Sequence, residues 1–201
     1  MMKNIAVNTI VGAVVVFILS SIWHVATPLG EVGVQNLPHE IVLSLAMKAA
    51  IPEAGFYFFP GMNHAPGMTK EQQQAEMKRY SDAYEAGPTG ILIYSPGGEA
   101  LNYGKLLSVQ FLIGLICAFF IAWILATTAA ATTFGQRVII AVFVSAFGGL
   151  LVPLEYWNWY KFPASYTFTY AAGIVVTWGL TGVVMAWIAG RGAKEGAKSA
   201  A

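Results

Sequence analysis

The sequence predicts an integral membrane α-helical protein, with four transmembrane helices and a small α+β extracytoplasmic domain inserted between helices 1 and 2. The first observation is that four stretches contain no Asp, Glu, Lys or Arg: residues 5–23, 106–128, 138–154 and 165–190. Each can cross a bilayer, because a helix needs about 20 mostly apolar residues to span the hydrocarbon core. The second observation is the composition: 57% of the 201 residues are hydrophobic and 10% are charged, whereas soluble domains average about 25% charged residues.

The predicted boundaries divide the chain into four parts. Residues 1–24 form transmembrane helix 1, residues 25–105 form the extracytoplasmic α+β domain, and residues 106–190 form a block of three transmembrane helices. Residues 191–201 are rich in Gly, Ala and Lys. We expect this last part to be a disordered cytoplasmic tail.

The first apolar stretch follows a short basic start, so it also fits a secretory signal peptide. It is longer than the usual apolar core of such a peptide, which has about 7–15 residues. The bulky residues Ile22 and Trp23 follow where a cleavage site needs small ones, although cleavage near Ala26 stays open. We therefore expect helix 1 to be retained in the membrane.

Within the inserted segment, turn-forming residues separate two helix patterns from two strand patterns. Pro38 opens the first helix, since proline is tolerated in a first turn. Residues 55–59 then form a strand rich in aromatic residues, which fit a pleated surface. A capping box at Thr69 and Gln72 opens a polar helix. Residues 91–94 predict the second strand.

The order strand, helix, strand most simply predicts a right-handed parallel pair of strands. Two strands cannot bury both of their faces by themselves, and the strand at residues 55–59 is apolar on both sides. We therefore expect the helices of the domain, the membrane surface or another subunit to cover this strand. The pattern favours a domain that lies flat on the bilayer.

The three later spans predict a compact block. The short link between the second and third spans, residues 128–137, predicts two antiparallel neighbouring helices. Small residues let helix backbones approach closely in lipid. The last two spans carry several glycines of this kind: Gly148, Gly149, Gly173, Gly179 and Gly182.

Three histidines lie in the part predicted to be outside: His24, His39 and His64. Three histidines could form an open zinc or copper site, but their spacings match no ligand motif, so we predict no metal site. His24 follows Trp23 at the point where helix 1 leaves the membrane. Both residue types suit an interfacial position, and we expect a structural role for them there.

The densest aromatic cluster, residues 155–163, joins the third and fourth spans. It predicts either an aromatic belt at the membrane edge or a binding site. In the second interpretation Glu155 directly follows an apolar span, where a carboxylate is costly unless it is paired, and it pairs with His24 or Lys161. Trp157 and Trp159 then roof a site for a lipid or quinone headgroup. The candidate ligand-binding residues are therefore His24, Glu155, Trp157, Trp159 and Lys161.

Catalytic motifs are absent from the sequence: it has no GxSxG, HExxH, Walker loop or GxGxxG. We therefore predict no catalytic residue and no cofactor. The net charge of +1 argues against a nucleic-acid partner, which would need a basic patch. A single cysteine, Cys117, excludes an intrachain disulfide.

Three functions follow, in order of preference. The first is a structural or accessory membrane protein whose outer domain and aromatic turn bind another protein or lipid. The alternative is a binding or carrier protein for a hydrophobic small molecule, either a lipid or a quinone. The third is a metal-dependent membrane enzyme that uses the histidines. The expected partners are the lipid bilayer and either a protein partner or further copies of the same chain.

The distribution of basic residues predicts a multi-pass protein of the cell membrane with both termini in the cytoplasm. Basic residues near the ends of spans favour the cytoplasmic side. The side of the termini holds one acid, Glu195, and five basic residues: Lys3, Arg137, Arg191, Lys194 and Lys198. A reporter fused after Ala201 should therefore be active only in its cytoplasmic form. Activity of a periplasmic reporter at the same position would overturn this orientation or the number of spans.

Overall fold

The computed structural model describes residues 2–200, with side chains as far as residue 194. The chain divides into two compact units. The first contains Met1–Val34 and Leu101–Ala201, and the second contains Gln35–Ala100.

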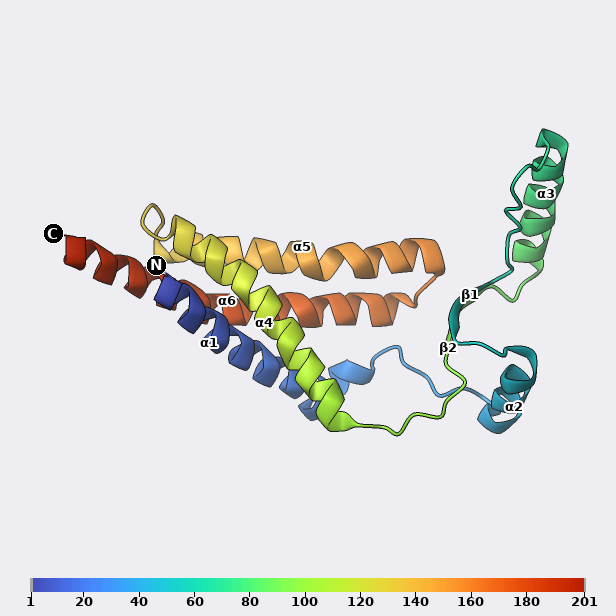
Figure 1. Ribbon diagram of the computed structural model, residues 1–201, viewed down its shortest axis with the longest axis horizontal. Helices are drawn as coiled ribbons and strands as arrows, with labels where there is room; N and C mark the ends of the chain where they lie inside the picture. Colours follow the sequence, from blue (N-terminus) through green and yellow to red (C-terminus); the bar gives the residue numbers. More distant parts are fainter. Residues whose placement is uncertain (1, 201) are drawn as a thin grey trace. The chain divides into compact units, whose positions relative to one another are not determined.

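The first unit is a helical bundle (Figure 1). Its helices are α1 (Met2–Ser21), α4 (Tyr103–Thr128), α5 (Phe134–Tyr160) and α6 (Ala164–Ala200). A π-helix, Ile22–Ala26, continues α1, and a 3₁₀ helix, Pro28–Glu31, follows it. All four long helices are apolar enough to cross a membrane, with mean hydropathies from 1.8 to 2.5. The four spans predicted from the sequence are therefore confirmed as four candidate transmembrane helices.

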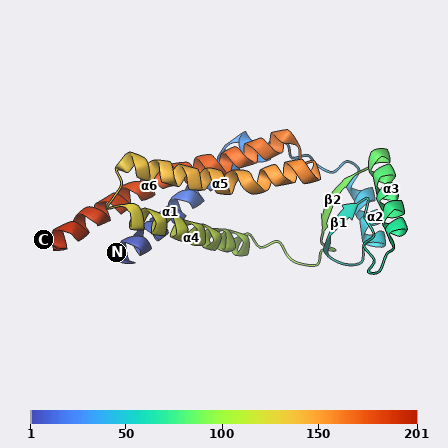
Figure 2. The same cartoon turned by 90° about the horizontal axis from the view of Figure 1, so that it is seen from above.

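The helices of this unit pack in a pattern centred on α6. The most extensive contacts join α5 to α6 and α1 to α4, and α1 also packs on α6. Figures 1 and 2 show α5 and α6 side by side, and the start of α1 and the end of α6 at the same end of the bundle. The short link after α4 predicted α4 and α5 as neighbours, but these two helices meet only over a small area. The link fixes only where the helix ends lie, so other contacts decide the packing.

Small residues bring α5 onto α6. A Cβ at Gly182 would lie 2.5 Å from the Cβ of Ala141, and a Cβ at Gly149 would lie 3.0 Å from Ile174. Close approach of this kind favours helix association in lipid, because the hydrophobic effect does not drive helices together there and van der Waals packing must do so. The predicted role of the glycines on the last two spans is therefore confirmed at Gly149 and Gly182.

Asn8 joins α1 to α6 through a buried polar contact. It is 1% exposed, and its Nδ2 donates a hydrogen bond to the carbonyl oxygen of Met185 at 3.1 Å. Gly12, one turn later on α1, leaves room for the side chain of the same Met185. Hydrogen bonds between membrane helices contribute about 0.6–2 kcal/mol each. The Asn8 amide therefore fixes the register of α1 against α6.

Arg137 lies in the first turn of α5 and is buried, with 7% of its surface exposed. Its Nε donates to the carbonyl of Ala186 on α6 at 3.0 Å, and its Nη1 donates to the carbonyls of Ala129, at 3.2 Å, and Thr132. The last carbonyls of a helix lack partners and carry partial negative charge, so the end of α4 suits a guanidinium. Arg137 thereby ties α4, α5 and α6 together.

The end of α6 extends through the segment predicted to be a disordered tail. The structure continues this helix to Ala200, whereas Ala201 lies outside the described residues. The guanidinium of Arg191 lies 4.2 Å from the ring centre of Trp187, one turn earlier, and such a contact favours continuation of the helix. Ala and Lys are also good helix formers, which the composition argument for disorder did not weigh.

The second unit contains α2 (Glu40–Ala50), β1 (Gly55–Phe59), α3 (Lys70–Ala86) and β2 (Gly90–Tyr94). All four elements occur close to where the sequence predicts them, but Pro38 lies before the first helix rather than in its first turn, because His39 is the N-cap of α2. The capping box is confirmed: the Thr69 side chain accepts a hydrogen bond from the Gln72 N–H, and the Gln72 side chain accepts one from the Thr69 N–H.

The strands pair, but the predicted parallel arrangement is wrong. β1 and β2 are antiparallel, with Tyr57 opposite Leu92 in the centre of the register. A parallel crossover needs a helix that packs back onto the sheet. α3 is a polar helix without a buried residue, so it does not bury a face in the way that such a crossover helix does.

The apolar side chains on one face of this small sheet are partly exposed. Phe56, Phe58 and Ile93 share this face and are 51%, 50% and 77% exposed. Three covers were expected for the aromatic strand: the helices of the same unit, the membrane surface and another subunit. The choice among them remains an expectation.

The Arg137 contact generates a test by double mutation. A Cβ at Gly190 would overlap Nη2 of Arg137, so Gly190→Ala should destabilise the bundle by about 1–3 kcal/mol, as overpacking does. In an Arg137→Ala background the obstacle is gone, and the same substitution should cost little. Thermal unfolding in detergent of the two single variants and the double variant measures this coupling.

Gly135→Ala is the matched control, because a Cβ at Gly135 meets nothing within 4 Å. It should leave the melting temperature unchanged in both backgrounds. Equal costs of Gly190→Ala with and without Arg137 would contradict the described packing.

Candidate functional site

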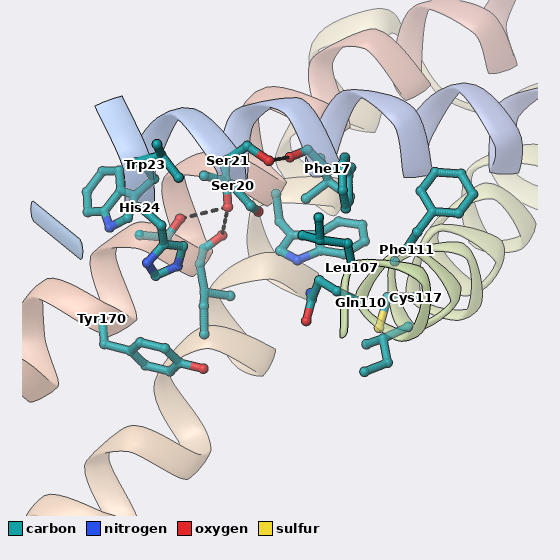
Figure 3. Close-up of a pocket in the computed structure, with 18 residues that line it drawn as sticks. Phe17, Ser20, Ser21, Trp23, His24, Leu107, Gln110, Phe111, Cys117 and Tyr170 are labelled. Atoms are coloured by element: carbon teal, nitrogen blue, oxygen red, sulfur yellow. Dashed lines mark hydrogen bonds between the residues drawn. The ribbon is translucent and has the colours of Figure 1, made fainter. Parts of the chain in front are cut away.

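A cavity of about 420 Å³ lies between α1, α4 and α6 (Figure 3). The last turns of α1 and the π-helix form one wall, the first half of α4 forms another, and the middle of α6 forms the third. Large apolar side chains line much of it: Phe17, Trp23, Phe111 and Trp178. Polar side chains from all three elements also line it: Ser20, Ser21, His24, Gln110, Tyr170 and Thr177.

The π-helix positions Trp23 and His24 on the cavity. The Thr27 hydroxyl donates to the Trp23 carbonyl at 2.6 Å and accepts from the Leu29 N–H at 3.2 Å, so it joins the π-helix to the 3₁₀ helix that Pro28 begins. Wide turns of this kind are rare in helices and occur frequently at functional sites.

Two glycines allow close contacts at this end of α1, one on α6 and one on the 3₁₀ helix. A Cβ at Gly173 of α6 would lie 2.7 Å from Nε1 of Trp23, so the glycine makes room for the indole. A Cβ at Gly30 would lie 2.8 Å from the Cα of His24, which lets the 3₁₀ helix fold back onto the π-helix. Trp23 and His24 are therefore placed by close backbone contacts on both sides.

The polar groups of the cavity fall into two sets. Thr177 donates to the carbonyls of Gly173 and Ile174, and Ser21 donates to the carbonyl of Phe17, so their own helices satisfy them. In the part of the chain with described side chains, no hydrogen bond forms to the Ser20 hydroxyl, the His24 ring, the Gln110 amide or the Tyr170 hydroxyl. In Figure 3 His24 and Tyr170 lie to one side of the cavity and Gln110 to the other.

The structure separates the residues that the sequence grouped into one site. Glu155 and Trp159 line a different hollow along α5, with Leu151 and Asn158. Trp157 packs against Phe168, with ring centres 5.8 Å apart.

Lys161 follows α5 in a left-handed conformation, with φ 56°, and its N–H donates to the carbonyl of Tyr156. Of the five candidates, only His24 lines the cavity between α1, α4 and α6. Trp159 is 73% exposed, so it does not roof a closed site.

Sequence reasoning missed Gln110 and Tyr170. The available signal was a polar side chain inside a charge-free span, since Gln110 is the fifth residue of its span and Tyr170 is the sixth residue of the last one. A position in a span does not reveal which face a residue occupies. The sequence alone could not bring these two side chains together with His24.

The arrangement offers hydrogen-bonding groups beside apolar walls. An imidazole, an amide and a phenol can bind the carbonyl, hydroxyl or phosphate oxygens of a ligand. Within residues 2–194 no group of three or more His, Cys, Asp or Glu side chains is close enough to hold a metal ion. His24 belongs to the first unit, whereas His39 and His64 belong to the second.

Comparison with protein-family models, with curated proteins and with solved structures gives no match for this chain.

The separation of His24 from Glu155 predicts independent behaviour. Both side chains are exposed and line different hollows, and an exposed ion pair contributes about 0–1 kcal/mol in any case. Glu155→Gln and His24→Ala should each shift the melting temperature in detergent only slightly, and the double variant should show the sum. A strongly non-additive double variant would show that the two residues form a buried pair instead.

Proposed function

We propose that this protein is a membrane-embedded binding protein for an amphipathic lipid-like molecule, of the lipid or quinone class. The observation that carries the proposal is the cavity with apolar walls, lined also by His24, Gln110 and Tyr170, whose side chains form no hydrogen bond within the described part of the chain. Its volume, about 420 Å³, falls within the range of about 300–1,000 Å³ typical of small-molecule sites. That volume suits a headgroup or a ring rather than a whole lipid.

An adjoining groove supports an amphipathic ligand. It lies between α1 and α4, has a volume of about 540 Å³, and is lined almost entirely by apolar side chains, among them Val14, Ile18 and Leu112. Phe17, Leu107 and Phe111 line both the groove and the cavity. A ligand with a polar head in the cavity would therefore place its hydrocarbon tail in this groove, at lipid depth.

The proposal includes an orientation in the cell membrane. The basic residues near the spans support cytoplasmic termini, which would put His24 and the second unit on the outer side. Trp23 and His24 would then mark the outer interface, where polar headgroups of lipids and quinones reside.

A second candidate is the accessory role, in which the second unit binds another protein. Exposed apolar side chains of this unit support this function: Ile93 of β2 is 77% exposed, and Ile41 and Leu45 of α2 are 78% and 64% exposed. Apolar patches of this kind mark interaction sites in soluble proteins. A stable protein partner that co-purifies in mild detergent would favour this role over ligand binding.

The ligand proposal is tested by substitutions that fill the cavity or remove its polar groups. Cys117→Phe places a ring in the cavity, whereas Ile116→Phe, at the preceding position on α4, places the same ring where the side chain does not line the cavity. Native mass spectrometry should find a bound lipid or quinone on the wild type and on Ile116→Phe, and much less on Cys117→Phe.

The polar groups give the second arm of the test. Gln110→Leu and Tyr170→Phe each remove one hydrogen bond worth about 0.5–1.5 kcal/mol, so each should weaken binding roughly 2- to 12-fold. Equal amounts of bound molecule on both phenylalanine variants, or no bound molecule on the wild type, would contradict the proposal.

A further inference from the structure

The second unit contains a separate hollow lined by thioether side chains. It has a volume of about 310 Å³. The segment between β1 and α3 supplies Met62, His64 and Met68 to its lining, and α3 supplies Met77. Three of the seven methionines of the whole chain thus line one small hollow, together with an imidazole.

The segment that carries these side chains is fastened to α3 at both ends. At its start the Asn63 N–H donates to Oε1 of Glu76 at 2.7 Å, and Nη2 of Arg79 donates to the carbonyl of Gly61 at 2.6 Å. At its end Nε2 of Gln73 donates to the carbonyl of Met68 at 3.2 Å. The backbone beside Met62 and Met68 is therefore held next to the helix that carries Met77, which is the preorganisation that a binding site needs.

The carboxylate that lines this hollow, Glu76, is already bound by Arg79. Arg79 donates to both oxygens of Glu76, at 2.6 Å and 2.8 Å. These hydrogen bonds, followed by the Asn63 N–H, lower the pKa of Glu76 to about 2. Because the shift is downward, its contribution to stability is fully present above the ordinary carboxylate pKa and is lost as the pH falls towards 2. Glu76 thus holds the segment in place, and the thioethers and the imidazole remain as donors.

Ordinary packing does not explain three methionines here. Methionine usually fills gaps in a buried core, but Met77 is 56% exposed, and Met62 and Met68 are only half-buried. A neutral thioether is a soft ligand, and soft thioether ligands select Cu(I) among the biological metals.

We propose that Met62, Met68, Met77 and His64 form a binding site for a soft monovalent metal ion, Cu(I). This site lies wholly within the second unit and is independent of the lipid-like ligand proposed above. It also differs from a site built on the three histidines, since only His64 of that group lines the hollow.

The test is a competition for Cu(I) between the full-length protein in detergent and a chromophoric Cu(I) chelator, under anaerobic conditions. The wild type should withdraw one Cu(I) per chain, and X-ray absorption should show sulfur in the coordination shell. The triple variant Met62→Leu, Met68→Leu and Met77→Leu conserves volume and should keep the fold. Its affinity should fall by more than about 100-fold, because losing even outer-shell partners of a metal costs about 10- to 100-fold.

Met47→Leu is the matched control, since Met47 is a half-buried methionine of α2 in the same unit and does not line the hollow. It should retain wild-type affinity. If the triple variant fails to fold, the single variant Met77→Leu carries the test, because this exposed side chain on α3 can be changed with little effect on packing. Three results would overturn the proposal: equal competition by wild type and folded leucine variants, a shell of nitrogen and oxygen only, or an equal loss in Met47→Leu.

Discussion

Two hydrogen bonds to neighbouring carbonyls of α6 hold the membrane bundle in its arrangement. The carbonyl of Met185 accepts from Asn8 of α1, and the carbonyl of Ala186 accepts from Arg137 of α5. In lipid the hydrophobic effect does not bring helices together, so close packing and polar contacts decide which helices meet. α6 receives both contacts within one turn, and Gly190 on the next turn leaves space for the guanidinium. These two carbonyls of α6 therefore set the positions of α1 and α5.

The cavity follows from how α1 is fixed at its two ends. Near its start Asn8 bonds α1 to α6, and beyond its end the indole of Trp23 lies against Gly173. α4 packs on α1 along its length but contacts α6 less extensively. The space enclosed where the three helices meet is therefore lined by the last turns of α1, the first half of α4 and the middle of α6, where polar side chains from all three gather. The contacts that fix α1 on α6 thus also shape the candidate site.

Much of the fold could be predicted from the sequence, because charge-free stretches, capping residues and turn residues act locally. The four apolar spans, the capping box at Thr69 and both strands occur where expected. The relative direction of the strands could not be predicted without asking whether α3 has an apolar face to lay on the sheet.

The site was predicted least well. Hydrophobic residues surround α1 and α4 almost evenly, so periodicity does not reveal which face points inwards. For that reason Gln110 and Tyr170 were missed, and His24 was grouped with Glu155, which lines a different hollow. The methionines of the second unit have no sequence spacing that suggests a site, and only the fastened segment brings them together.

The central claim is that an amphipathic molecule occupies the cavity and extends into the groove between α1 and α4. Photocrosslinking in native membranes tests it most directly, with a benzophenone amino acid at Leu107, which lines both spaces, and at Phe143, a 70% exposed residue of α5 that lines neither. Mass spectrometry of the adducts should find one lipid or quinone species strongly enriched at position 107 and only the bulk lipid mixture at position 143. The same bulk mixture at both positions would contradict the account.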